Sequence, residues 1–298
     1  MIEQKLDEIL RWLAPLDCTQ KHKDTHRLRQ EGTCKWFPNT DLYEKWRAPG
    51  NRFLWLHGKG TVLVPSWSPQ LTPWDHRCAH RWLRKVSVDV SLLVIDIHAC
   101  IDGGSGSTIE HLKSTLSEEE VVVFFYCDFQ NERSTSSTEL MRSLLSQLLC
   151  HIRDHSPVDP GDFPDKILKQ KSKGTLSLDD TRKLCDLVSR AANFFRYEPM
   201  IVIDALDECA DVEALLPALI TLSQSDVRLL VTSRPDQTIV DHFTSLQSLS
   251  FEDVTEEIAA DIALHVRREL DSHNRLRSAV PEMKKEIFEQ LTERAEGR

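Results

Sequence analysis

Apolar positions along the chain follow two spacings that alternate with each other. Short apolar runs predict buried strands at 53–58, 121–127, 200–204, 227–235 and 246–251. Helical spacing predicts helices at 2–14, 41–47, 109–116, 140–149, 178–195, 212–223, 253–270 and 281–295. The segment 155–173 carries three prolines and predicts a loop-rich connection. Strands alternating with helices in this way predict an α/β fold, a parallel sheet with helices on both faces.

The strand predicted at 200–204 runs directly into three carboxylates, Asp204, Asp207 and Glu208. Ligand sites in open α/β sheets lie outside the carboxyl ends of the strands, so these acids would stand at such an edge. One carboxylate there can hold Mg²⁺, and a second can orient and deprotonate an attacking water. The alternative is a surface turn whose acids are simply solvated.

A phosphate-binding loop of the form G-x-x-x-x-G-K-[ST] is expected where the first strand ends, at Gly58. The pattern fails there, because Leu63 stands in place of the second glycine. What resembles its second half comes much later, from Gly103 to Thr108, and lacks the lysine. The intervening segment 60–103 differs in composition, being rich in tryptophan, proline, histidine and arginine. We interpret it as an atypical insertion, or as translated intervening sequence. Its residues His76, Cys78 and His80 match no ordinary zinc spacing.

Composition narrows the function classes. The formal net charge of −10 argues against a broad nucleic-acid or anionic-membrane surface. No apolar run approaches the roughly 18 residues that span a bilayer, and the acidic N-terminus is unlike a signal peptide. We therefore expect a cytoplasmic protein with no membrane span. Its eight scattered cysteines predict reduced thiols. The charged stretch 21–31 predicts a solvated helix face.

Three signals in order carry a resemblance to a family: a strand ending in Gly58-Lys59, then I-V-I-D-A-L-D-E-C at 201–209 with its preceding methionine, then L-L-V-T-S-R-P at 229–235. Together they resemble the NACHT domains of fungal signal-transduction NTPases of the STAND class, including the nephrocystin-like N-terminal module. The segments 10–16, 29–33, 54–58 and 125–129 also look like the upstream region of that family. The likeness covers most of the chain outside 60–103.

The resemblance implies a role for each matching residue. Asp204 would hold Mg²⁺, with Ser107 as a second ligand, and Asp207 and Glu208 would polarise the attacking water. Arg234 would sense the γ-phosphate, although an ion pair with a nearby acid is its structural alternative. The implied nucleotide-binding positions are Gly58, Lys59, Gly104, Gly106, Ser107, Thr108, Thr232 and Ser233. Lys59 matches only a variable position of the loop, since the phosphate-gripping lysine would stand between Gly106 and Ser107.

The resemblance implies a P-loop NTPase sheet at 51–254, a helical N-terminal lead-in at 1–50 and the start of a helical extension at 255–298, which we expect to be truncated. The implied function is a switch that binds ATP or GTP with Mg²⁺ and hydrolyses it slowly. Protein partners, through C-terminal repeats beyond this chain, and homo-oligomers fit such a switch. The alternative is a nucleotide-free scaffold, because the loop is broken. An unrelated hydrolase is disfavoured, since no Ser/His or Cys/His pair stands at matching strand ends.

Overall fold

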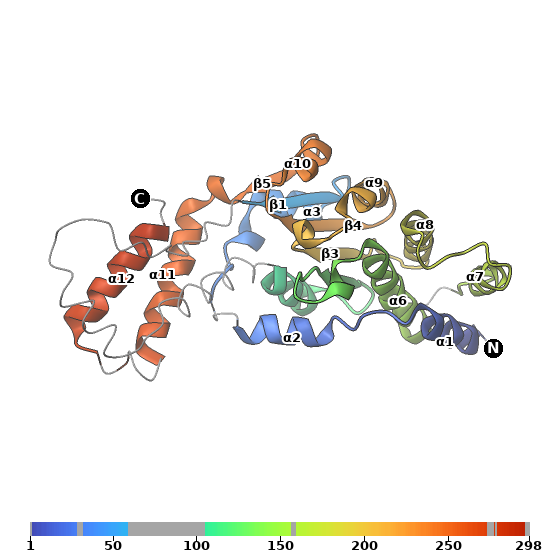
Figure 1. Cartoon of the computed structure of the whole chain (residues 1–298), viewed down its shortest axis with the longest axis horizontal. Helices are drawn as coiled ribbons and strands as arrows, with labels where there is room; N and C mark the ends of the chain where they lie inside the picture. The colour runs from blue at the N-terminus through green and yellow to red at the C-terminus, as the bar shows by residue number, and fades with distance from the viewer. Residues whose placement is uncertain are drawn as a thin grey trace.

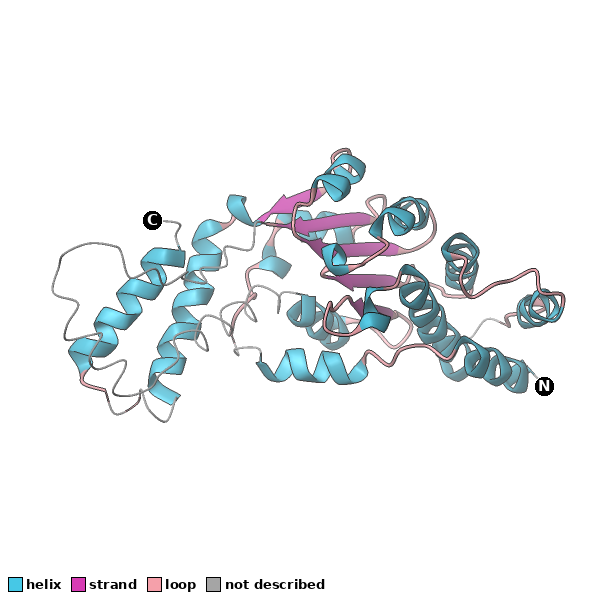
Figure 2. Ribbon diagram, viewed as in Figure 1, coloured by secondary structure: helices cyan, strands magenta, loops and turns pink. Residues whose placement is uncertain are grey.

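The computed structural model describes residues 2–28, 32–58, 105–155, 159–272, 277 and 279–295. Within these, five strands form one parallel sheet in the order β2-β3-β4-β1-β5. The strands are β1 (Phe53–His57), β2 (Val122–Tyr126), β3 (Met200–Asp204), β4 (Arg228–Ser233) and β5 (Ser248–Ser250). The predicted parallel sheet is confirmed, and its near-continuous apolar strands are buried because helices cover both faces (Figure 2).

The helices lie around this sheet and beyond it (Figure 1). Besides a helix described over 105–115, they are α1 (Ile2–Leu13), α2 (Thr19–Leu28), α3 (Asp41–Arg47), α6 (Ser137–His155), α7 (Phe163–Ser172), α8 (Thr181–Ala192), α9 (Val212–Ser223), α10 (Gln237–Phe243), α11 (Thr255–Ser272) and α12 (Pro281–Ala295). Short 3-10 turns are η1 (Phe37–Asn39), η2 (Glu132–Thr135), η3 (Leu206–Glu208) and η4 (Phe251–Asp253). No helix in the described part of the chain has the length and apolar character that a bilayer span requires.

Connection handedness places the helices on two faces. The chain leaves β1 in one direction across the sheet and returns through β2, β3 and β4 in the other, finally passing over β1 to β5. Right-handed crossovers therefore put the helix after β1 on one face and α6, α8, α9 and α10 on the opposite face. The contacts of α6 with α8, of α8 with α9 and of α9 with α10 agree with this. Neighbouring strands β1 and β4 thus send their helices to opposite faces, which opens a crevice at their carboxyl ends.

The predicted loop-rich connection at 155–173 is wrong in part, because it contains the helix α7. Pro164 stands in the first turn of this helix, where the missing N–H would have no intrahelical partner and the fixed φ suits a helix. Phe163 and Ile167 of α7 are buried, which supplies the tertiary support that a ten-residue helix needs. Pro164 therefore marks the start of a helix instead of excluding one.

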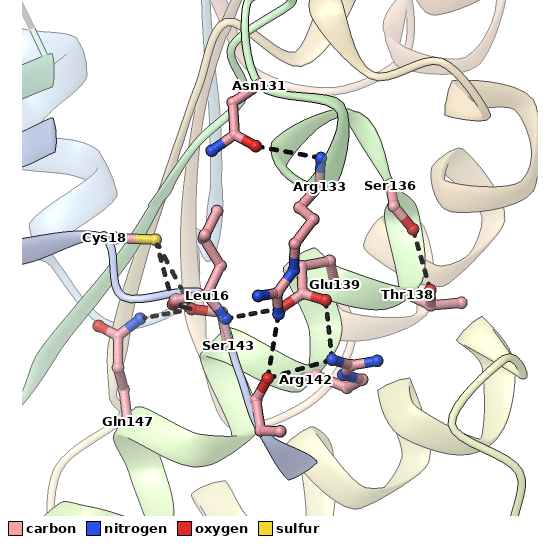
Figure 3. A network of polar contacts seen from close by, with 11 residues as sticks. Leu16, Cys18, Asn131, Arg133, Ser136, Thr138, Glu139, Arg142, Ser143 and Gln147 are labelled. Carbon is pink, nitrogen blue, oxygen red and sulfur yellow. Dashed lines mark hydrogen bonds and ion pairs between the residues drawn. The ribbon is translucent and has the colours of Figure 1, made fainter.

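The N-terminal lead-in is fastened to α6 by a buried carboxylate (Figure 3). Glu139, 5% exposed, accepts the backbone N–H of Leu16 at 2.5 Å and pairs with Arg133 and Arg142, each at 2.8 Å. Both guanidinium groups also donate to the carbonyl of Ala14. The N–H of Leu16 and the carbonyl of Ala14 thus have charged partners on Glu139, Arg133 and Arg142. These charge-assisted hydrogen bonds hold the turn between α1 and α2 against α6.

At the opposite end of the molecule from α1, the helices α11 and α12 pack against each other (Figure 1). Asp261 of α11 is tied to the N-terminal lead-in: its Oδ2 accepts the backbone N–H of Cys34 at 2.7 Å and the indole N–H of Trp36 at 3.0 Å. Cys34 has a positive φ of 59°, an uncommon conformation for a residue other than glycine. The lead-in thus contacts both the sheet domain and the helical extension.

Candidate functional site

Four strands bring one row of side chains to the carboxyl edge of the sheet. Tyr126 pairs in register with Asp204, and Leu56 pairs with Thr232. The pairing of Ile203 with Val231 sets Asp204 level with Thr232. Side chains level with one another in neighbouring strands share a face, so the row Tyr126, Asp204, Thr232 and Leu56 faces one side. That side is the one covered by the helix 105–115, to which Tyr126 is linked through His22 and Glu110.

Asp204, 9% exposed, is held by its neighbour on β4. The hydroxyl of Thr232 donates to Asp204 Oδ1 at 2.6 Å and accepts the backbone N–H of Ala205 at 3.0 Å. A carboxylate fixed in this way keeps its orientation without help from a ligand. Thr232, expected to contact nucleotide, therefore has a hydroxyl already engaged in orienting the carboxylate expected to hold Mg²⁺.

The other two acids return to the site through a tight turn. Ala205 adopts a left-handed conformation, with φ 53°, and the 3-10 turn η3 follows it directly. Asp207 then accepts the backbone N–H of Arg234 at 2.9 Å, and its second oxygen lies 3.7 Å from Arg234 Nε. The ion pair considered for Arg234 is therefore formed, while the arginine side chain stays 60% exposed. These contacts connect residues 205–208, which we call the acid turn, to the end of β4.

Glu208 occupies a different environment from Asp207. Its Oε2 accepts the backbone N–H of Phe129, the residue three positions beyond the end of β2, at 2.9 Å. Burial raises the pKa of Glu208 above its ordinary value, and the nearby Asp207 and Asp128 carboxylates act in the same direction, against the Phe129 hydrogen bond. A carboxylate with a raised pKa is a stronger base, so Glu208 is suited to take a proton from water.

The first described turn of the helix 105–115 lies near this row. Ser105, Ser107 and Thr108 are all at most 5% exposed, and a Cβ at Gly106 would lie 3.7 Å from the Tyr126 hydroxyl. The predicted start of this helix at Ile109 is therefore too late, because Ser105 to Thr108 are already helical. Within the part of the chain that the structure describes, the buried Ser107 hydroxyl has no hydrogen-bond partner. A buried polar group in that condition is costly, and a ligand is one means of satisfying it.

Gly58 follows β1 directly, in a crowded position. A Cβ there would come within 2.7 Å of Phe251, so only glycine fits. His57, before it, stacks on Trp55 with 4.0 Å between ring centroids, and burial lowers its pKa. Trp55 donates its indole N–H to the Ser233 hydroxyl at 2.8 Å. Ser233 and Trp55 face the opposite side of the sheet from Thr232 and Leu56, because successive side chains in a strand alternate.

An open, mostly apolar concavity adjoins the row. Its walls come from the N-terminal lead-in, the strand ends, the first described turn of the helix 105–115 and α11. They are formed by Cys34, Trp36, Phe37, Leu56, Ser105, Thr232, Phe251, Ile258, Asp261 and Ile262. Apolar walls with a few convergent polar groups are the kind of lining that small-molecule sites have.

Several expected residues cannot be placed. Lys59, Gly104, the insertion 60–103 and its His76, Cys78 and His80 lie outside the described residues. Within the described ranges, no three His, Cys, Asp or Glu side chains gather as a metal site. All six described cysteines are free thiols, as the sequence predicts.

Three residues contribute to the site without a role predicted from the sequence. Tyr126 lies in a predicted strand and in the family-like segment 125–129, and Asp261 lies in a predicted amphipathic helix. His22 lies in the stretch predicted to be a solvated helix face, yet it is 5% exposed and in contact with Tyr126. Neither His22 nor Asp261 lies in a motif, and the partners of all three residues are far away in the sequence.

One comparison with known proteins gives a match. Residues 105–234 match the family model described as Nephrocystin 3, N-terminal, a domain found in NACHT-type proteins. The matched region begins in the helix that precedes β2 and ends at Arg234, so it contains the acid cluster and the end of β4. No curated protein and no solved structure matches the chain.

Proposed function

We propose that the chain is a nucleotide-dependent switch of the NACHT/STAND type, which binds ATP or GTP with Mg²⁺ at the carboxyl ends of β1, β3 and β4 and hydrolyses it slowly. The output would be the position of α11 and of any partner engaged with it. In such switches the γ-phosphate biases one of two arrangements, and the conformation carries the signal.

The observation that carries the proposal is the Ser107 hydroxyl, which is buried in a helix turn near the row that contains Asp204 and has no hydrogen-bond partner among the described residues. This turn lies toward the N-terminal side of the helix 105–115, where the helix dipole favours negative charge such as that of phosphate. Ser107 and Asp204 are the residue types that hold Mg²⁺ beside phosphates, and they would do so here. The bound metal would neutralise charge on the β- and γ-phosphates.

The four polar residues around the acid turn would serve three roles. Asp207 would orient Arg234, whose exposed guanidinium is placed to approach a γ-phosphate. Glu208 would accept the proton of the attacking water, because its pKa is raised and its carboxylate is oriented by Phe129. Thr232 would act on Asp204 rather than on the nucleotide.

The cavity bounded by Trp36, Leu56 and Ile262 is a suitable place for the base. It is mostly apolar, adjoins Ser105 in the turn proposed for phosphate, and is walled on one side by α11. A base bound there would contact the lead-in, the sheet and the extension together. Occupancy of the site would therefore affect how α11 is held.

A nucleotide-free scaffold is the second candidate, and one feature favours it. The turn Ser105 to Thr108 contains no lysine, and in the described residues the only cation shown to contact the acid turn is Arg234, already paired with Asp207. Phosphates near three carboxylates need compensating positive charge. Without it, the fold could present its surface to partners and bind no nucleotide.

Thermal unfolding separates the two candidates. A ligand present at 100 times its dissociation constant stabilises by about 2.7 kcal/mol, which corresponds to a rise in Tm of roughly 5 °C or more for a domain of this size. The switch predicts such a rise with Mg·ATP or Mg·GTP, and its loss with EDTA. Asp204→Asn should abolish the rise, whereas Glu213→Gln, an exposed change on α9, should leave it intact. An unchanged Tm at millimolar nucleotide would establish the scaffold instead.

A further inference from the structure

The helix α2 is attached to the sheet in an unusual way. Among its side chains that the structure describes, only His22 is buried, while most of the others are exposed and polar. A surface helix normally packs through an apolar stripe. Here the anchor is an imidazole, whose contacts are directional, so α2 can fix the orientation of what it touches as well as cover it.

The two ring nitrogens of His22 reach different elements. Nδ1 lies 2.7 Å from the Tyr126 hydroxyl on β2, and Nε2 lies 2.7 Å from Glu110 Oε1 on the helix 105–115. Lys113 Nζ approaches Nε2 at 3.0 Å and Glu110 Oε1 at 3.2 Å. A single neutral tautomer serves both main contacts: Nε2–H donates to Glu110, and the Tyr126 hydroxyl donates to Nδ1. Burial lowers the pKa of His22, which favours this neutral form.

Further contacts place α2 against the same turn. The His22 ring packs on Phe124 at 4.7 Å between centroids, and a Cβ at Gly106 would meet Thr25 of α2 at 3.3 Å. Lys21 forms an ion pair with Asp128, just beyond the end of β2, at 2.5 Å. The helix α2 therefore touches the candidate phosphate turn at Gly106, the strand beside Asp204, and the loop that orients Glu208.

We infer that His22 is a positioning residue, which clamps the helix 105–115 to β2 and so fixes the turn 105–108 beside the row that contains Asp204. Buried Ile109 and Leu112 hold the helix against the core. Apolar packing is not directional, however, so the hydrogen bonds from Glu110 through His22 to Tyr126 determine the orientation of the helix relative to β2. The N-terminal lead-in would thereby control the geometry of the site. The importance of that turn for nucleotide rests on the proposed function, whereas the clamp itself does not.

Two substitutions of His22 remove its contacts with Glu110 and Tyr126 separately. His22→Asn keeps a polar atom near the position of Nδ1 and loses the contact with Glu110, while His22→Gln keeps one near Nε2 and loses the contact with Tyr126. Hydrogen exchange of the whole chain, followed by peptide, reports each element. His22→Asn should speed exchange in 105–115 about tenfold, the factor equivalent to about 1.4 kcal/mol, and should leave β2 unchanged. His22→Gln should speed exchange in α2 relative to 105–115. The exposed His26→Gln on the same helix is the matched control, and α8 is the internal reference.

The outcomes are distinct. Equal acceleration in every peptide, α8 included, would mean that His22 only stabilises the fold, and would overturn the inference. Unchanged exchange of 105–115 in His22→Asn would also overturn it. If the wild-type chain binds Mg·ATP, His22→Asn should raise the Kd about tenfold, with His26→Gln unchanged. If the wild-type chain binds no nucleotide, the proposed function fails, and the exchange pattern still decides the clamp.

Discussion

Thr232 Oγ1 lies 2.6 Å from Asp204 Oδ1 and also accepts the N–H of Ala205, so one hydroxyl joins β4 to the acid end of β3. Asp204 is nearly buried, and this bond contributes to its orientation. Thr232→Val keeps the shape of the side chain but removes the hydroxyl that donates to Asp204 Oδ1 and accepts the backbone N–H of Ala205. We expect a loss of about 1–3 kcal/mol in unfolding free energy.

Chemical denaturation measures that loss, and Thr232→Ser is the matched control, since it retains the hydroxyl. Serine should recover most of the stability and, if the proposed function holds, most of the nucleotide affinity. Equal stability of the valine and serine variants would show that the hydroxyl does not support Asp204.

The hydrogen bonds of Asp261 with the lead-in predict that this residue helps to hold α11 against the lead-in. Asp261→Ala removes the acceptor for the Cys34 and Trp36 N–H groups. We expect faster proteolysis and hydrogen exchange in α11 and α12, together with a shift of tryptophan emission as Trp36 loses its indole partner. Glu257→Ala, an exposed change on the same helix, should show neither effect. Unaltered protection of α11 in the Asp261 variant would mean that apolar contacts alone hold the extension.

The carboxylate of Glu139 predicts the stability of the N-terminal attachment (Figure 3). Glu139→Leu leaves Arg133 and Arg142 without their partner and the Leu16 N–H without its acceptor. Breaking one side of a buried ion pair typically costs about 3–5 kcal/mol, and the partial exposure of Arg133 places this case near the lower value. Limited proteolysis between α1 and α2 reports the effect. Glu132→Leu, at an exposed acid in the same region, should leave the cleavage rate unchanged.

One buried and two half-buried histidines predict that the free energy of unfolding decreases as the pH falls. Burial lowers the pKa of His22, His57 and His151 below their ordinary 6.5. Below about pH 6.5 the unfolded chain then binds more protons than the folded chain, so stability is full above that pH and is lost as the pH falls. Unfolding free energies measured from pH 7.5 to pH 5 should decline. His22→Gln should reduce the slope and the exposed His26→Gln should not. An identical slope in His22→Gln would show that His22 does not contribute.

Restoring the phosphate-binding loop tests whether the absence of its lysine limits the affinity for nucleotide. Deleting 60–102 and inserting a lysine between Gly106 and Ser107 gives Gly58-Lys-Gly-Gly-Ser-Gly-Lys-Ser, which completes the G-x-x-x-x-G-K-[ST] pattern. A charged hydrogen bond contributes about 1.5–3 kcal/mol. Affinity for Mg·ATP, measured by calorimetry, should therefore rise about tenfold to a hundredfold over the same deletion without lysine. Equal affinities would mean that another group limits binding.

The sequence by itself determined the parallel sheet, most of the helices and the acid cluster, because each depends on neighbours close along the chain. Apolar runs specified all five strands, and the turn after Asp204 placed three acids at one edge. The prediction of a loop at 155–173 was wrong over α7, because Pro164 is compatible with a first helical turn. The burial of Phe163 and Ile167 stabilises that helix.

Tertiary structure alone decided which partners the site residues have. Thr232 is 28 positions from Asp204, Tyr126 is 104 from His22, and Asp261 is 227 from Cys34. Hydrogen bonds and burial depend on proximity in space, which strand order and connection handedness create, and no local pattern encodes it. For this reason the sequence supplied the acids of the site, while the fold determined that Thr232 orients one of them and that a histidine from a charged helix is buried against Tyr126 on the neighbouring strand.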